Sequence, residues 1–60
     1  MKLELGLTYS VLKSDNTIIT FKFVGEIEHG QVFGLVNGEL MPFSTIFANG
    51  YLFCWEIPNI

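Results

Sequence analysis

The residues best suited to chemistry are two glutamates and a histidine in the middle of the chain. Glu26, Glu28 and His29 are the only place where acidic side chains and an imidazole stand together. Alternation along a strand puts the two carboxylates on one face, a spacing that a shared metal ion could use. No fourth ligand stands nearby in the sequence, so we interpret the three residues as solvated groups that flank a turn. The sequence therefore predicts no metal site.

The possible nucleophiles lack the partners that catalysis requires. Cys54 is the single cysteine, and a reactive thiolate needs a nearby base or positive charge. Its place between Phe53 and Trp55 favours a small packed residue. None of the three serines lies in the Gly-x-Ser-x-Gly turn of hydrolases. We therefore predict that the protein is not an enzyme and that it has no catalytic residues and no cofactor.

Composition argues against nucleic-acid binding, secretion and a membrane-spanning helix. Only 15% of the residues are charged, the net charge is −3, and the cationic side chains are three lysines. Without arginine or a basic stripe, the chain is not expected to bind nucleic acid through its backbone. A single cysteine cannot form an internal disulfide, which is typical of a reducing compartment, so we expect the cytoplasm. Glu4 interrupts any signal-peptide core, and no apolar run approaches the roughly 18 residues of a membrane helix.

Apolar residues alternate with polar ones in the first half of the chain, which is typical of strands with one buried face. A first strand is predicted over residues 3–11 and a second over residues 18–24. A three-residue loop with Asn16 in the left-handed conformation brings every apolar residue opposite another apolar one. The expected pairs are Lys13 with Thr17, Val11 with Ile19, Tyr9 with Phe21, and Leu7 with Phe23.

The second half contains shorter elements between clear turn signals. We expect tight turns at His29–Gly30 and Asn37–Gly38, a strand over residues 31–36, and a strand over residues 39–41 that ends at Pro42. A single helical turn over residues 44–48 has Ser44 as its N-cap and stops at Asn49–Gly50. The last strand, residues 51–57, is expected to contribute Trp55 to the core. Its apolar face consists of Tyr51, Phe53, Trp55 and Ile57.

This order of elements resembles that of the SH3-like small barrels. The resemblance implies an all-β fold in which five antiparallel strands close into a small barrel, with one helical turn before the last strand. We expect residues 1–60 to form this single domain, with Gly25 and Gly34 as bends or bulges. The likeness is one of architecture, because the Ala-Leu-Tyr-Asp-Tyr start and paired tryptophans of peptide-binding SH3 domains have no counterpart in residues 5–9 or the single Trp55. No polyproline groove is implied.

Both faces of the middle strands are apolar, although a single-layer barrel buries only one. A two-residue turn at His29–Gly30 predicts the pairs Ile27 with Val32, Val24 with Leu35, and Glu26 with Phe33. The face left exposed, which Leu12 and Ile18 extend, contains four apolar residues: Val24, Phe33, Leu35 and Leu40. In a soluble protein, an exposed patch of this kind indicates a partner surface.

These features predict a protein-interaction module that forms a homodimer through the apolar face. An acidic rim of Glu26, Glu28 and Glu39 is expected to meet a basic partner protein. Small chains without catalytic residues are typical of accessory proteins of phages and other mobile elements, which bind and occlude a host protein. The alternative is a binder of a small ligand or nucleic acid, with an aromatic platform on the barrel. That platform would use Tyr9, Tyr51 and Trp55.

Overall fold

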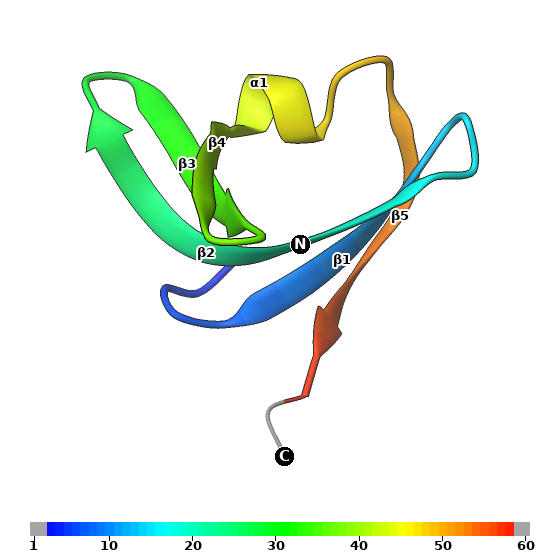
Figure 1. Ribbon diagram of the computed structural model, residues 1–60, viewed down its shortest axis with the longest axis horizontal. Helices are drawn as coiled ribbons and strands as arrows, with labels where there is room; N and C mark the ends of the chain where they lie inside the picture. The colour runs from blue at the N-terminus through cyan, green and yellow to red at the C-terminus, as the bar shows by residue number, and fades with distance from the viewer. Residues whose placement is uncertain (1–2, 59–60) are drawn as a thin grey trace.

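The computed structural model describes residues 3–58 and shows one antiparallel five-stranded sheet with a short helix (Figure 1). The strands lie side by side in the order β4-β3-β2-β1-β5, and α1 comes between β4 and β5 in the chain. Their bounds are Thr8–Lys13 for β1, Ile18–Glu28 for β2, Gln31–Val36 for β3, Glu39–Pro42 for β4, Phe43–Ile46 for α1 and Tyr51–Ile57 for β5. Within residues 3–58, no helix is long and apolar enough to cross a membrane.

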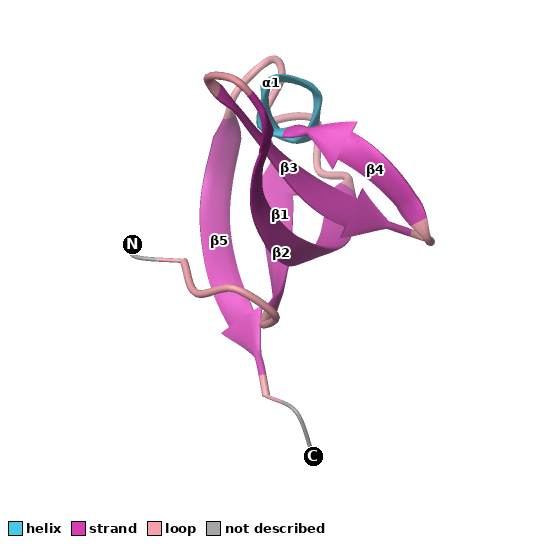
Figure 2. Ribbon diagram, turned by 90° about the vertical axis from the view of Figure 1, so that its left-hand side faces the viewer, coloured by secondary structure: helices cyan, strands magenta, loops and turns pink. Residues whose placement is uncertain are grey.

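The predicted closure of the sheet into a barrel is wrong. β4 and β5 are the two edges of the sheet and do not pair with each other. The sheet instead curves around the core, and α1 lies over its concave side against β3 and β4 (Figures 1 and 2). β4 has only four residues and ends at Pro42, which lacks an N–H donor. Ile46 of α1 is fully buried and packs against the concave side of the sheet next to Gly34.

The long hairpin between β1 and β2 has the predicted register. Val11 pairs with Ile19 and Tyr9 with Phe21. The Lys13 N–H donates to the Thr17 carbonyl at 2.8 Å, and Asn16 is left-handed with φ of 72°. A type I turn followed by a left-handed residue closes such a three-residue loop without disturbing the ladder.

The predicted first strand begins later than residue 3. Gly6 has a φ of 84°, and the Leu7 N–H donates to the Glu4 carbonyl, so residues 4–7 form a turn before β1 starts at Thr8. Leu5 is consequently 70% exposed, whereas Leu7 packs against the core and accepts the Phe23 N–H at 2.9 Å. The alternation of apolar residues therefore continues beyond the strand that it predicts.

The pairing of β2 with β3 differs from the predicted register. Lys22 pairs with Leu35 and Glu26 with Val32, because the register shifts once after Phe23 and again after Glu26. The predicted pairs of Val24, Glu26 and Ile27 with β3 are therefore wrong. Gly25, predicted as a bend or bulge, lies at the first shift with a φ of 82°, a conformation that glycine adopts without strain.

Gly34, by contrast, is a regular strand residue and not a bend. It pairs with Phe23 on one side and Met41 on the other. A Cβ atom there would lie 2.8 Å from Phe21 Cδ2 and 3.1 Å from Ile46 Cδ1. Gly34 is thus required by close packing of the core against β3.

The core lies between the concave side of the sheet and α1. Its fully buried apolar side chains are Tyr9, Val11, Phe21 and Ile46. The Phe21 ring contacts those of Phe43 and Phe47, with centroids 5.4 and 6.0 Å away. Three aromatic rings thus join the helical segment to the sheet.

The helical turn begins and ends earlier than predicted. α1 spans Phe43–Ile46, and its N-cap is Pro42, with no side-chain hydrogen bond, so the prediction of Ser44 as N-cap is wrong. Proline suits this position because it has no N–H to satisfy and a fixed φ. Asn49 and Gly50 both have positive φ, as expected of the residues that end the helical segment and lead into β5.

Candidate protein-binding surface

The convex side of the sheet, here called the outer face, carries apolar side chains over β1, β2 and β5. Residues directly opposite one another in an antiparallel ladder point to the same face. Leu12 pairs with both Ile18 and Phe53, and Ser10 pairs with both Thr20 and Trp55. Ile18 is 59%, Phe53 66% and Trp55 40% exposed. We define the aromatic patch as Leu12, Ile18, Phe53 and Trp55.

A bulge in β5 gives the aromatic patch its two rings. Leu12 pairs with Phe53 and Lys13 with Tyr51, so Leu52 is an extra residue without a partner on β1. Tyr51 therefore lies on the concave side, where its ring packs on that of Phe47 with centroids 4.9 Å apart. The predictions that Tyr51 shares a face with Phe53 and that Trp55 lies in the core are both wrong.

Cys54 points to the opposite side from the aromatic patch. It pairs with Val11, a buried core residue, and packs against the core cluster, as predicted. Burial raises the pKa of the thiol above its usual value, and a raised pKa reduces the fraction of nucleophilic thiolate. The environment of Cys54 is therefore that of a packed residue.

Two hydroxyl groups on the outer face are hydrogen-bonded to each other. Ser10 Oγ and Thr20 Oγ1 are 2.8 Å apart and share a hydrogen bond across β1 and β2. Ser10 is only 3% exposed. A polar group that already has a partner can be covered by another surface without the cost of an unsatisfied donor. Burial of the aromatic patch thus costs less than it would if the two hydroxyls were separate.

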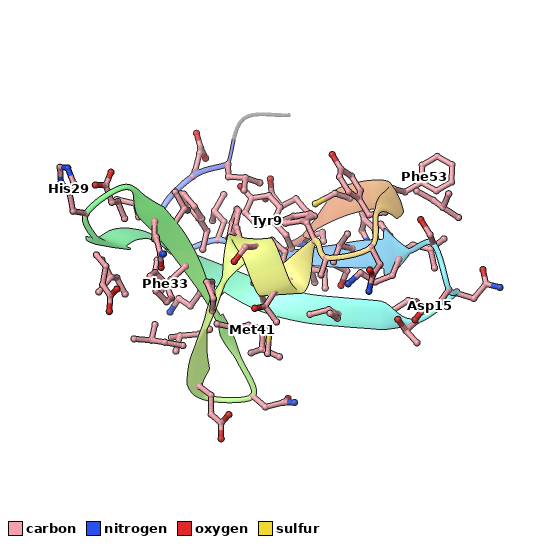
Figure 3. All side chains as sticks on the ribbon, turned by 90° about the horizontal axis from the view of Figure 1, so that it is seen from above. Tyr9, Asp15, His29, Phe33, Met41 and Phe53 are labelled. Atoms are coloured by element: carbon pink, nitrogen blue, oxygen red, sulfur yellow. The ribbon has the colours of Figure 1, made fainter. Side chains whose placement is uncertain are left out.

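A second apolar region lies on the outer face over β3 and β4. Leu35 pairs with Leu40 and Phe33 with Pro42. Leu40 is 52% exposed, whereas Phe33, Leu35 and Val24 are half-buried, and Val24 occupies the register shift without a partner on β3. Figure 3 shows Phe33 far from Phe53, toward the other end of the sheet.

Three exposed glutamates flank this second region. Glu28 pairs with Gln31 and lies on the outer face, whereas Glu39 pairs with Val36 and Glu26 with Val32, so these two carboxylates extend from the concave side at the two ends of β3. Lys22, which pairs with Leu35, is an exposed cation on the outer face. We define the acidic patch as these glutamates with three apolar neighbours: Phe33, Leu35, Leu40, Glu26, Glu28 and Glu39. It contains the predicted partner-binding residues apart from Val24.

Glu26 has a structural role that the sequence did not indicate. Its carboxylate accepts a hydrogen bond from the Gly30 N–H at 3.0 Å and so closes the His29–Gly30 turn. His29 lies at the tip of this turn, away from the sheet (Figure 3). Within the described part of the chain, no three His, Cys, Asp or Glu side chains are grouped to hold a metal ion.

The three rings of the alternative aromatic platform do not converge. Tyr9 is 2% exposed, and its hydroxyl accepts the Glu4 N–H at 2.9 Å. Tyr51 packs on Phe47 on the concave side, whereas Trp55 lies on the outer face. A cage for a cation or a base needs rings around one space, and this arrangement does not supply it.

Two open depressions lie elsewhere on the surface, with volumes of about 230 and 320 Å³. The first is formed by residues 13–15 and 48–50, and the second by residues 30–32 and 42–44. Neither includes Cys54, His29 or the exposed residues of the two patches. Comparison of the chain with protein-family models, curated proteins and solved structures gave no match. The surface itself is therefore the basis for any functional proposal.

Proposed function

We propose that this protein is a non-enzymatic interaction module of the cytoplasm that binds a basic partner protein through the acidic patch. The observation that carries the proposal is Leu40, an apolar side chain that is 52% exposed on an edge strand, with exposed Glu39 preceding it in the chain. Leu35 and Phe33 extend the apolar area, and Glu28 stands at its far end. An apolar centre with a charged rim is the usual composition of a protein interface.

The negative charge of the chain favours a basic partner protein. The chain has six acidic residues against three lysines, so a basic surface is attracted and an acidic one is repelled. A small chain of this kind acts by covering its partner, which is the behaviour of accessory proteins that phages and other mobile elements use to occlude a host protein. The patch supports binding and occlusion without any requirement for catalysis.

Affinity purification followed by reconstitution tests the proposal. The tagged chain should retain one protein in stoichiometric amount, and the purified pair should bind with an affinity that falls as salt is raised. Leu40→Glu should weaken binding at least tenfold, and the double variant Glu28→Gln, Glu39→Gln should weaken it and reduce its salt dependence. Glu26 is left unchanged because its carboxylate holds the neighbouring turn.

Phe53→Glu is the matched control, because it places the same charge on an exposed apolar residue of the same face outside the acidic patch. It should leave partner binding unchanged. Equal losses from Phe53→Glu and Leu40→Glu would contradict the assignment of the acidic patch. Co-purification of nucleic acid or a small molecule in place of a protein would favour the aromatic-platform alternative.

A further inference from the structure

We infer that the aromatic patch is the self-association surface of this protein and that a second copy of the chain covers it in a two-fold dimer. The inference concerns a different part of the outer face from the acidic patch. It rests on the charge of the aromatic patch, on its polar groups and on its area.

Charge is the first argument for a second copy. The two rows of paired residues that form the region contain Leu12, Ile18 and Phe53 in one and Ser10, Thr20 and Trp55 in the other. None of these side chains is charged. In a two-fold contact each residue near the axis meets its own kind, so a charge there would repel its copy. A neutral surface avoids this repulsion, although it offers nothing to select a charged partner.

The polar groups supply the second argument. Two hydroxyls lie on this neutral surface, and they are already bonded to each other at 2.8 Å. A hydroxyl facing a second copy would otherwise need a donor or acceptor at a symmetric position. This bond uses one of the two O–H donors, so covering the patch in a dimer costs fewer hydrogen bonds to water than covering two separate hydroxyls would.

The third argument is the area. Ile18, Phe53 and Trp55 are 59%, 66% and 40% exposed, which amounts to roughly 300–400 Å² at about 200 Å² for a large side chain. A small stable interface buries about 600 Å² per partner, and about 65% of a homodimer interface is apolar. The patch therefore supplies the apolar area of an interface at the low end of the stable range.

The shape of the sheet keeps the two surfaces separate. β2 curves at the Gly25 register shift, which lies beyond Lys22, the residue that pairs with Thr8 of β1 and with Leu35 of β3 (Figure 1). Phe53 and Phe33 lie toward opposite ends of the molecule in Figure 3. A second copy on the aromatic patch would consequently leave the acidic patch free, and each dimer would present two acidic patches.

Sedimentation and tryptophan emission test this inference on the intact chain. Trp55 is the single tryptophan, so its emission reports on the patch directly. The wild-type protein should sediment as a dimer at about 100 μM, dissociate in the micromolar range, and show a red shift of Trp55 emission on dilution as the ring becomes hydrated. A folded monomer at about 100 μM, or emission that does not change between dimer and monomer, would overturn the inference.

Two substitutions at Phe53 locate the interface. Phe53→Glu should weaken the dimer at least 100-fold while the circular dichroism spectrum remains that of the folded chain. Phe53→Ser removes the ring without adding charge, should weaken the dimer at least tenfold, and keeps the test valid if the glutamate variant does not fold. Retention of wild-type dimer affinity by folded Phe53→Ser would overturn the inference.

Leu40→Glu is the reciprocal control. It introduces the same charge at a residue that is 52% exposed on the acidic patch, and it should leave the dimer intact. Dissociation by Leu40→Glu to the same extent as by Phe53→Glu would overturn the assignment to the aromatic patch. Because partner binding is measured separately with the same two variants, failure of the dimer and failure of the proposed function give different results.

Discussion

The aromatic patch and the apolar residues of the acidic patch lie on one face of the sheet, but the strand pairing beneath them differs. Under the aromatic patch, β1 and β2 pair without a break over five residues, and the one irregularity is the bulge at Leu52 in β5. Under the acidic patch, β2 and β3 shift register twice. In the aromatic patch Ile18 and Phe53 are exposed and Leu12 is half-buried. In the acidic patch Leu40 is exposed, whereas Phe33 and Leu35 are half-buried.

The two patches also differ in the polar groups that surround them. The acidic patch has carboxylates at both ends, and the aromatic patch has a bonded pair of hydroxyls at its side. Charges at a rim favour one class of partner and repel others, while a neutral patch whose hydroxyls are hydrogen-bonded to each other is suited to self-association. One outer face can thus serve two contacts, provided that the backbone holds the patches apart.

The largest expected effect comes from disturbing the backbone under the acidic patch at Gly34. Gly34→Ala adds a Cβ that would lie 2.8 Å from Phe21 Cδ2 and 3.1 Å from Ile46 Cδ1, so the free energy of unfolding should fall by about 2 kcal/mol. The melting temperature should fall by roughly 8–16 °C. Hydrogen exchange should accelerate more in β3 and β4 than in β1 and β5.

Gly30→Ala is a suitable control for the Gly34 variant. Gly30 has a φ of 78° and no atom within 4 Å of a built Cβ, so alanine there costs about 1 kcal/mol from the left-handed backbone alone. A smaller loss for Gly34→Ala than for Gly30→Ala would contradict the close packing of β3 on the core.

The two regions also differ in how far their sequence predicts them. Hairpin turns were predicted correctly, because Asn16 and Asn37–Gly38 fix the register locally, and they place Ile18 beside Leu12 and Leu40 beside Leu35. The bulge at Leu52 was not predictable, because both alternations of β5 are apolar. Its position depends on the distant contact of Tyr51 with Phe47. The aromatic patch was therefore missed, apart from Leu12 and Ile18, which the alternation of the first hairpin places on the outer face.

The difference between local signals and long-range contacts also explains why the predicted barrel closure was wrong. The number, order and antiparallel pairing of the strands follow from local turn signals and alternation, and the single helical turn follows from the short segment between Pro42 and the Asn49–Gly50 stop. Closure of a barrel requires the edge strands β4 and β5 to pair, which is a long-range contact that turn signals and alternation do not predict. In this structure β4 is only four residues long, and the buried Ile46 packs on the sheet instead.

Substitutions in the two hairpin turns are expected to have effects of intermediate size on stability. Asn16 and Asn37 both have positive φ, 72° and 52°, but Asn16 closes a three-residue loop whose left-handed position favours glycine, while Asn37 starts an Asn-Gly turn that favours asparagine. Asn16→Gly should be neutral or stabilise the protein by a few tenths of a kcal/mol. Glycine avoids the backbone cost that asparagine has in the left-handed conformation, but it loses more conformational entropy on folding.

Asn37→Gly should be neutral or slightly destabilising, as measured by chemical denaturation of both variants side by side. The pair thus compares the turn next to the aromatic patch with the turn next to the acidic patch. A loss above about 1.5 kcal/mol for Asn16→Gly would mean that the Asn16 side chain makes a bond on which the loop depends.

The smallest expected effect concerns Asp15, which lies in the loop of the first hairpin. Its Oδ1 accepts the Thr17 N–H at 3.1 Å and the Thr17 hydroxyl at 2.6 Å, and these bonds hold the pKa of the carboxyl below its usual value of 3.8. A carboxyl whose pKa is lowered by folding stabilises the protein when ionised. This contribution is present above about pH 4 and is lost as the pH falls through the folded-state pKa.

Asp15→Asn tests this expectation, because the amide oxygen can still accept the Thr17 bonds but does not titrate. The wild type should melt at a higher temperature than Asp15→Asn at pH 6, and the difference should shrink as the pH is lowered toward 2.5. Thr17→Val, which removes the hydroxyl donor, should likewise weaken the dependence on pH. Because Asp15 is fully exposed, added salt should reduce the effect, and a difference between wild type and Asp15→Asn that is the same at pH 6 and pH 2.5 would show that the ionised carboxylate does not stabilise the turn.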